Sequence, residues 1–242
     1  MKIDSQKIIA DTHQSFTTSS AQQKKFNDLD AFVDEKEYKL LHRNFLTPTS
    51  IIIDVDKFLS DIANYSQYFY KWGNNHSELP RYGLALVNQD GILKLNDPIN
   101  GSLHEWNRNF PDNPIIETDC CTSTEVMQLK SLQPLRVFDG HWCRSNILKW
   151  HLGAHFKPHI DTVLPSPWLR LWGTTNADMF DINYDTGLKR LTKFPDIEAG
   201  RIYIIDTSIV HDAVSYTNDV YQFFLSVRPS AINILKEHLC PA

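Results

Sequence analysis

The second half of the chain holds a series of short apolar segments, and this series constrains the fold more than any other feature. Residues of the turn-forming types Gly, Pro, Asn and Asp lie between the segments. Short strands at such spacing indicate a β-sandwich or a β-barrel. The predicted strands are 145–151, 156–161, 168–174, 179–184, 189–192, 201–206, 211–215 and 220–227.

The first half of the chain has a different pattern, in which helices are more prominent. Asp54 or Asp56 is a suitable N-cap for a helix that ends near Trp72. Thr122 and Glu125 fit a capping box that opens another helix. The remaining predicted elements are a helix from 21 to 33, strands at 50–53 and 81–87, and a C-terminal helix at 230–239.

These elements predict a single domain over residues 1–242, mainly β with flanking helices (α+β). The β core occupies about 142–228. Helices and strands from about 21–141 support it, together with the short C-terminal helix 230–239. A chain of 242 residues is long enough to bury a core of this size.

Composition and charge narrow the possible partners and the compartment. The formal net charge of −5 gives no support for a nucleic-acid or membrane-surface partner. No apolar run approaches the roughly 20 residues of a membrane span, and the first residues lack the apolar region of a secretory signal. The four cysteines form no CxxC pair, which favours free thiols in a reducing cytoplasm. We therefore expect a cytoplasmic protein.

A candidate metal site lies in the run from Gly153 to Thr162. His159 and Asp161 are two residues apart on a predicted strand, so their side chains project to the same side. His211, at the start of a later strand, can complete the set. Two imidazoles and one carboxylate, with coordination positions left open, are expected of non-haem Fe(II) oxygenases.

A competing metal site would use His151, His155 and His159, whose spacing of four suits zinc on one face of a helix. Gly153 and Pro158 fall inside that window and would break such a helix. His155 is expected to lie near the site as a solvated or cavity-lining residue.

Residues 142–228 resemble the Fe(II)/2-oxoglutarate-dependent dioxygenases, in particular the aspartyl/asparaginyl β-hydroxylase-like or proline-hydroxylase-like group. Three stretches carry the resemblance: GAHFKPHID at 153–161, LRLWGTTN at 169–176, and AGRIYIIDTSIVHDAVSYTNDVYQFFLSV at 199–227. The resemblance implies a double-stranded β-helix, the jelly-roll or cupin-like fold. It also implies Fe(II) held by His159, Asp161 and His211, with 2-oxoglutarate as co-substrate and O₂ as oxidant.

The resemblance further implies a cation for the 5-carboxylate of 2-oxoglutarate, preferably an arginine that binds it with two hydrogen bonds. The family commonly places this cation about ten residues after the second histidine. That position falls at Val220, Tyr221 or Gln222, none of which is basic, and Gln222 can donate only neutral hydrogen bonds. Arg170, on the strand after the HxD motif, is the favoured replacement, and Arg228 is the second candidate.

The implied activity is hydroxylation of an unactivated C–H bond, with release of succinate and CO₂. A small metabolite or amino acid is favoured as substrate over a protein side chain, and nucleic acid is disfavoured. Two other functions stay open: a binding protein with a vestigial metal site, and a cupin-like metalloenzyme that does not use 2-oxoglutarate. Neither the identity of the substrate nor the oligomeric state follows from the sequence.

Overall fold

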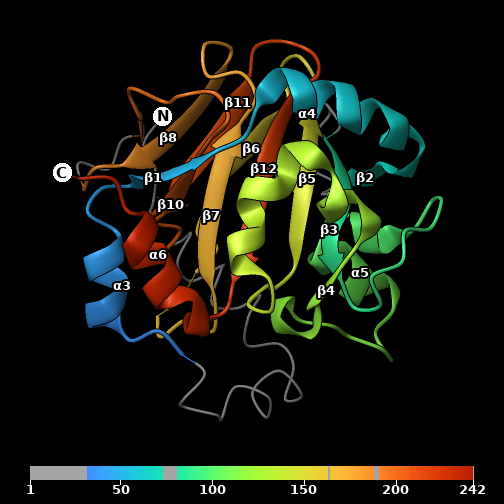
Figure 1. Cartoon of the computed structure of the whole chain (residues 1–242), viewed down its shortest axis with the longest axis horizontal. Helices are drawn as coiled ribbons and strands as arrows, with labels where there is room; N and C mark the ends of the chain where they lie inside the picture. The colour runs from blue at the N-terminus through green and yellow to red at the C-terminus, as the bar shows by residue number, and fades with distance from the viewer. Residues whose placement is uncertain (1–31, 73–80, 163, 188–190, 242) are drawn as a thin grey trace.

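The computed structural model describes residues 32–72, 81–162, 164–187 and 191–241, and its strands form two sheets (Figure 1). The larger sheet has the strand order β1-β10-β7-β12-β5-β3-β2, with β4 paired to β3, and the smaller has the order β6-β11-β8-β9. The larger sheet contains β1 (Leu46–Ile52), β2 (Tyr70–Trp72), β3 (Arg81–Asn88), β4 (Thr122–Ser123), β5 (Ser145–Trp150), β7 (Leu169–Thr174), β10 (Arg201–Ile205) and β12 (Val220–Val227). The smaller sheet contains β6 (His155–His159), β8 (Phe180–Asp185), β9 (Leu191–Lys193) and β11 (His211–Ser215).

The strands from β5 to β12 form a double-stranded β-helix. Along the chain they pass back and forth between the sheets, because β5, β7, β10 and β12 lie in the larger sheet and β6, β8, β9 and β11 in the smaller. Neighbouring strands within each sheet are antiparallel. This is the jelly-roll arrangement. The predicted fold class is therefore confirmed, and each predicted core strand matches an observed one to within two residues at either end.

Strands from the first half of the chain widen the larger sheet at both edges. β1 pairs with β10, and β3 pairs with β5 on the opposite edge. The strands predicted at 50–53 and 81–87 correspond to β1 and β3. The pairing of β3 with β5 places Arg81 directly beside Trp150. This pairing brings a residue of the amino-terminal half next to the β core.

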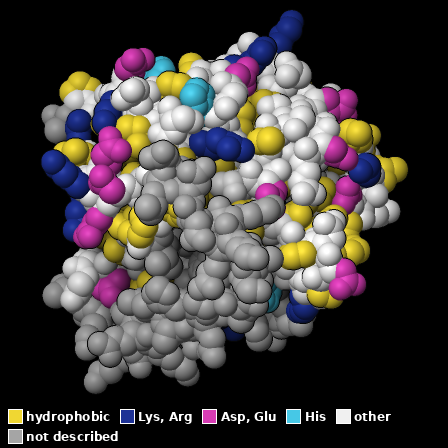
Figure 2. All heavy atoms as spheres, turned by 90° about the horizontal axis from the view of Figure 1, so that it is seen from below, with side chains coloured by type: hydrophobic (Ala, Val, Ile, Leu, Met, Phe, Trp, Pro, Cys, Tyr) yellow, Lys and Arg dark blue, Asp and Glu magenta, His cyan; other side chains and the backbone are white. Residues whose placement is uncertain are grey.

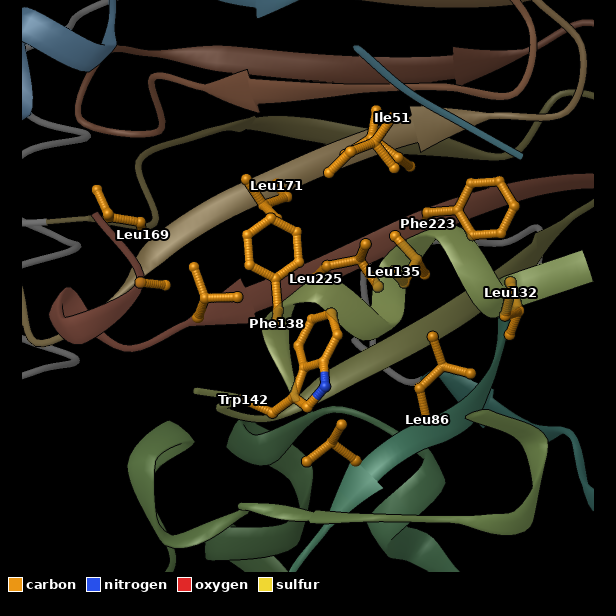
Figure 3. Close-up of a cluster of buried hydrophobic side chains, with 14 of the residues drawn as sticks. Ile51, Leu86, Leu132, Leu135, Phe138, Trp142, Leu169, Leu171, Phe223 and Leu225 are labelled. Carbon is orange, nitrogen blue, oxygen red and sulfur yellow. The ribbon is translucent and has the colours of Figure 1, made fainter. Parts of the chain in front are cut away.

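Alternation of side chains along the larger sheet divides the core into two parts. On β12, Phe223, Leu225 and Val227 face outward into a cluster with the helical segments, as Figure 3 shows for the first two. The alternate residues of β12 face the smaller sheet, where Val220 and Phe224 pack with Trp150 and other inner residues. Because the side-chain period of a strand is two, every second residue of these strands is available to line the space between the sheets.

Helical segments cover the outer face of the larger sheet (Figure 1). The α-helices are α3 (Glu35–Leu41), α4 (Val55–Ile62), α5 (Leu103–Asn109) and α6 (Ile232–His238). The 3-10 helices are η2 (Ala63–Tyr68), η3 (Pro98–Asn100), η4 (Glu117–Asp119), η5 (Glu125–Gln128), η6 (Lys130–Phe138) and η7 (Pro229–Ala231). The helix predicted at 21–33 lies almost entirely outside the described residues.

Two predicted helices differ from the structure. Asp54 caps α4 by accepting from the backbone of Lys57 at 3.1 Å, but this helix tightens into η2 after Ile62 instead of continuing to Trp72. The sequence of η2 is ANYSQY, and its Asn, Ser and Tyr residues are poorer helix formers than Ala or Leu. The capping box predicted at Thr122 is also wrong, because Thr122 pairs with β3 and 3-10 helices follow.

We expect Gly200→Ala to lower the free energy of unfolding by about 3 kcal/mol. Gly200 has a φ of +80°, and an added Cβ would lie 2.3 Å from the carbonyl oxygen of Ile53. The cost combines a left-handed backbone, about 1–2 kcal/mol, with overpacking, about 1–3 kcal/mol. Gly140 is the matched control, because its φ is +85° but an added Cβ meets no described atom within 4 Å. Denaturant unfolding should show only about 1 kcal/mol lost in Gly140→Ala, and equal losses would contradict the steric argument.

Candidate active site

Adjacent strands of the smaller sheet bring two histidines and one aspartate together. His159 ends β6 and His211 begins β11, and the two residues are direct partners in the ladder. Nε2 of His159 lies 3.4 Å from Oδ1 of Asp161, and Nε2 of His211 lies 3.8 Å from Oδ2. One ligand atom from each of the three residues lies within 4.8 Å of the others.

The orientation of both imidazole rings suits a metal ion. Nδ1 of His159 donates to the carbonyl oxygen of Lys157 at 2.7 Å, and Nδ1 of His211 donates to that of Ile209 at 2.9 Å. Because a carbonyl oxygen can only accept, each ring carries its proton on Nδ1 and turns the lone pair of Nε2 toward Asp161. Nε2 of His159 is buried without a hydrogen-bond partner. Three electron-pair donors thus face one point with no proton between them, which is the arrangement that a bound divalent cation would satisfy.

Electrostatics at the site favour the protonation states of metal ligands. Burial alone would raise the pKa of Asp161, but the His159 and His211 rings together hold it well below its usual range. Burial lowers the pKa of His211 to about 4, and the neighbouring His159 acts in the same direction. At neutral pH, Asp161 is therefore a carboxylate and His211 a neutral imidazole, as coordination requires.

The structure differs from the sequence analysis in how Asp161 is held. β6 ends at His159, so Asp161 lies just beyond the strand, where its backbone N–H donates to the carbonyl oxygen of Thr207 at 3.0 Å. His155 lies outside the group of candidate ligands, and its Nε2 lies 3.1 Å from Oδ2 of Asp212. Residues 151–159 form a turn and a strand rather than a helix, so the alternative zinc site does not form.

A cavity of about 700 Å³ adjoins the three candidate ligands and lies between the two sheets. Its inner wall includes Trp150, Trp168 and Trp172. Its outer part is formed by residues of α5 and of the segment that leads to Glu117. Mostly apolar walls with a few convergent polar groups are typical of a small-molecule site.

The three residues proposed from the sequence as co-substrate ligands occupy different places. Arg170 and Gln222 both line the cavity. Oε1 of Gln222 accepts a hydrogen bond from Nε1 of Trp150 at 2.9 Å. Arg228 is not among the cavity-lining residues, and its guanidinium donates to the backbone carbonyls of Thr118 at 3.1 Å and Trp142 at 3.5 Å.

Arg81 is a cavity residue that the sequence analysis did not identify. It is 2% exposed, and its guanidinium lies over the rings of Phe156, at 4.0 Å, and Trp150, at 4.9 Å. Its Nε and Nη1 have no hydrogen-bond partner, and no carboxylate in the described part of the chain forms an ion pair with it. Burial lowers the pKa of Arg81 to about 9, partly opposed by Asp161, so the residue is still a cation at neutral pH.

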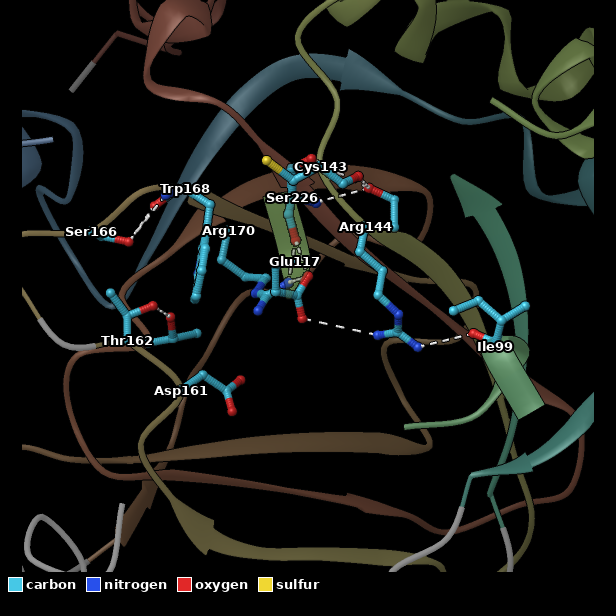
Figure 4. Close-up of polar contacts among 12 residues, drawn as sticks. Ile99, Glu117, Cys143, Arg144, Asp161, Thr162, Ser166, Trp168, Arg170 and Ser226 are labelled. Atoms are coloured by element: carbon cyan, nitrogen blue, oxygen red, sulfur yellow. Dashed lines mark hydrogen bonds and ion pairs between the residues drawn. The ribbon is translucent and has the colours of Figure 1, made fainter. Parts of the chain in front are cut away.

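Two further buried arginines that line the cavity share one carboxylate (Figure 4). Oε2 of Glu117 lies 3.5 Å from Nη1 of Arg170, and Oε1 lies 4.0 Å from Nη1 of Arg144. Arg170 also donates to the hydroxyl of Ser226, its direct partner across the β7–β12 ladder. We call Glu117, Arg144 and Arg170 the two-arginine cluster.

No protein-family model and no curated protein sequence matches this chain. Among solved structures, a prolyl-4-hydroxylase from Pseudomonas putida has a TM-score of 0.42 and 8% identity over 79% of this chain and 95% of its own. A 2OG-Fe(II) oxygenase family protein from Burkholderia pseudomallei has a TM-score of 0.40 and 10% identity over 72% of this chain and 78% of its own. KdgF from Halomonas sp. has a TM-score of 0.26 and 14% identity, and the match covers 35% of this chain and 66% of that one.

These structures include oxygenases of the superfamily that the sequence resembles, and they distinguish no subgroup within it. The order and pairing of β5 to β12, rather than scores at this level, define the fold of this chain. Among the described residues, no helix has the length and apolar character needed to cross a membrane.

Proposed function

We propose that this protein is an Fe(II)- and 2-oxoglutarate-dependent dioxygenase that hydroxylates an unactivated C–H bond of a small molecule. The observation that carries the proposal is the convergence of His159, Asp161 and His211 at the wall of a cavity that also holds buried cations. In this proposal the three residues hold Fe(II). When bound, the iron with 2-oxoglutarate and O₂ supplies the oxidising chemistry, and the other products are succinate and CO₂.

We assign the 5-carboxylate of 2-oxoglutarate to Arg81. Its Nε and Nη1 have no hydrogen-bond partner, so the guanidinium keeps buried N–H donors for a carboxylate. Arg170, the residue favoured from the sequence, already shares Glu117 and donates to Ser226. Gln222 faces the same space from β12, and we assign it a supporting role because its Oε1 is engaged by Trp150.

The residues around the site would shield the reaction from water. The rings of Phe156 and His159 are tilted by 38° with centroids 3.7 Å apart, and the Phe45 ring lies 5.9 Å from the His211 ring. Such aromatic contacts fix the ligand rings and keep the local dielectric low, which strengthens the attraction between the buried charges.

We propose a small-molecule substrate, such as an amino acid, and a cytoplasmic location. The cavity volume of about 700 Å³ suits a small ligand. On the face drawn in Figure 2, basic and acidic side chains are interspersed over the described residues, a distribution that offers a polyanion no extended contact. The four cysteines are unpaired, as in a reducing compartment.

The test is co-substrate turnover. Purified protein given Fe(II), 2-oxoglutarate and O₂ should bind 2-oxoglutarate in calorimetry and form succinate, slowly without substrate and faster with it. Protein that binds the metal but neither binds nor consumes 2-oxoglutarate would refute the proposal. That result would favour a non-catalytic binding protein with a vestigial metal site, for which Gln222 in place of a cation is the supporting observation. Uptake of O₂ without 2-oxoglutarate would instead favour the cupin-like metalloenzyme.

A further inference from the structure

The two-arginine cluster carries more positive charge than its carboxylate can neutralise. Arg144 and Arg170 together bear two positive charges and Glu117 bears one negative charge, so a net charge of +1 remains in a buried place. Arg144 is 1% exposed and Arg170 is 4% exposed. Leaving a buried charge uncompensated is costly, which makes an anionic ligand the natural complement.

The donors of this cluster are also incompletely used. Nε of Arg144 and Nε of Arg170 are buried without hydrogen-bond partners. Neither arginine makes a close two-point contact with Glu117, because the nearest nitrogen–oxygen distances are 3.5 and 4.0 Å. A well-matched arginine–carboxylate pair would be nearer 2.8 Å, so the cluster has capacity to bind a further acceptor.

Surrounding contacts fix both guanidinium groups in position. Arg144 donates to the carbonyl oxygens of Ile99, at 3.3 Å, and Gly101, and it lies over the Trp72 ring. Arg170 lies 4.1 Å from the centre of the Phe224 ring. Groups held in this way lose little further freedom when a ligand binds.

We propose that the two-arginine cluster binds a carboxylate group of the primary substrate, which makes the substrate a small carboxylic acid. This inference rests on the proposed function, which assigns Arg81 to 2-oxoglutarate and leaves the two-arginine cluster for the substrate. The charges agree with this division: in the described part of the chain, Arg81 has no ion-pair partner, the cluster has two cations for one carboxylate, and both line one cavity. The substrate carboxylate takes the second of these places, with its reactive carbon toward His159 and Asp161.

The test measures binding without turnover, so that it does not depend on iron or 2-oxoglutarate. The full chain, free of metal, is titrated by calorimetry with a panel of small carboxylic acids and amino acids and with the matched primary amides. Carboxylates should bind and the amides should bind at least about tenfold more weakly. Binding should survive in Arg81→Met, since that residue belongs to the other anion site.

Two variants of the cluster should change carboxylate binding in opposite directions. Glu117→Gln keeps the shape and raises the net charge of the cluster to +2, so carboxylates should bind about tenfold more tightly. Arg170→Met lowers the net charge to zero and should weaken binding by about 30-fold or more. If the cluster had only a structural role, carboxylate binding would be lost in both variants. Tighter binding in Glu117→Gln therefore distinguishes a binding role from a structural role, even if Arg170→Met folds poorly.

Three results of the titrations with the carboxylate panel would overturn the proposal. One is equal binding of acids and amides, another is loss of carboxylate binding in Arg81→Met, and the third is weaker binding in Glu117→Gln. If 2-oxoglutarate binding, rather than binding of the panel, responded to the cluster variants, the cluster would be the co-substrate site and the assignment would be wrong. If 2-oxoglutarate fails to bind while the panel binds as expected, the oxygenase function falls and the carboxylate site stands.

Discussion

Asp161→Asn is expected to weaken Fe(II) binding by at least about 100-fold and to abolish succinate formation. The carboxylate is the only anionic member of the ligand group, and it lies 3.4 and 3.8 Å from the two histidine Nε2 atoms. Changes to residues that merely orient metal ligands cost about 10–100-fold in affinity, so loss of a ligand should exceed that range. Anaerobic titration with Fe(II), followed by calorimetry, measures the affinity directly.

The matched control is His151→Ala. His151 belongs to the alternative zinc spacing, but it lies outside the ligand group, where its ring contacts Tyr82. The His151→Ala variant should bind Fe(II) with the same affinity as the unaltered protein. Loss of metal affinity in His151→Ala, or normal affinity in Asp161→Asn, would reject the ligand assignment.

Arg81→Met is expected to weaken 2-oxoglutarate binding by about 100-fold and leave Fe(II) binding intact. Truncating one partner of a buried, hydrogen-bonded charge pair costs about 2–5 kcal/mol, and each 1.4 kcal/mol is tenfold in affinity. Methionine approximates the length of the arginine stem, so the packing against Trp150 and Phe156 is partly kept. Calorimetry with 2-oxoglutarate on the metal-loaded protein, in the absence of O₂, measures the change.

The Arg81→Met variant should lose affinity for 2-oxoglutarate without losing free energy of unfolding. Arg81 is buried with two donor atoms unpaired, so its replacement removes a desolvated charge and should leave the free energy of unfolding unchanged or raise it. Arg228→Met is the control, because Arg228 was a sequence candidate for the same role but lies outside the cavity lining. Equal losses of 2-oxoglutarate affinity in both variants would show that neither arginine is a specific anchor.

The candidate metal-binding group could be predicted from the sequence because the information is local. His159 and Asp161 are two residues apart, and the strand pattern near His211 is regular enough to place it on a neighbouring strand. The same regularity predicted β5 to β12 to within two residues. Alternation along β7 also explains why Arg170 faces inward between the outward residues Leu169 and Leu171.

Arg81, Arg144 and Glu117 could not be placed in the same way. Their positions depend on the pairing of β3 with β5 and on the turn at residues 99–101, both of which are contacts between distant parts of the chain. Side-chain periodicity says which residues share a face of one strand, but it does not say which strands will pair. One signal was present, an arginine at the start of an otherwise apolar strand at 81–87, where a buried charge requires a reason.

Adding β3 to the edge of the jelly roll divides the proposed chemistry between two stretches of polypeptide. The proposed iron ligands lie within 159–211, whereas the proposed co-substrate anchor, Arg81, belongs to β3. In this proposal, binding of 2-oxoglutarate would require that β3 is paired with β5. A chain in which β3 has detached would retain its metal-ligand group but lose the cation opposite it. The residues proposed to bind iron and the residue proposed to bind 2-oxoglutarate thus come from separate parts of the sequence, and they line one cavity only in the folded chain.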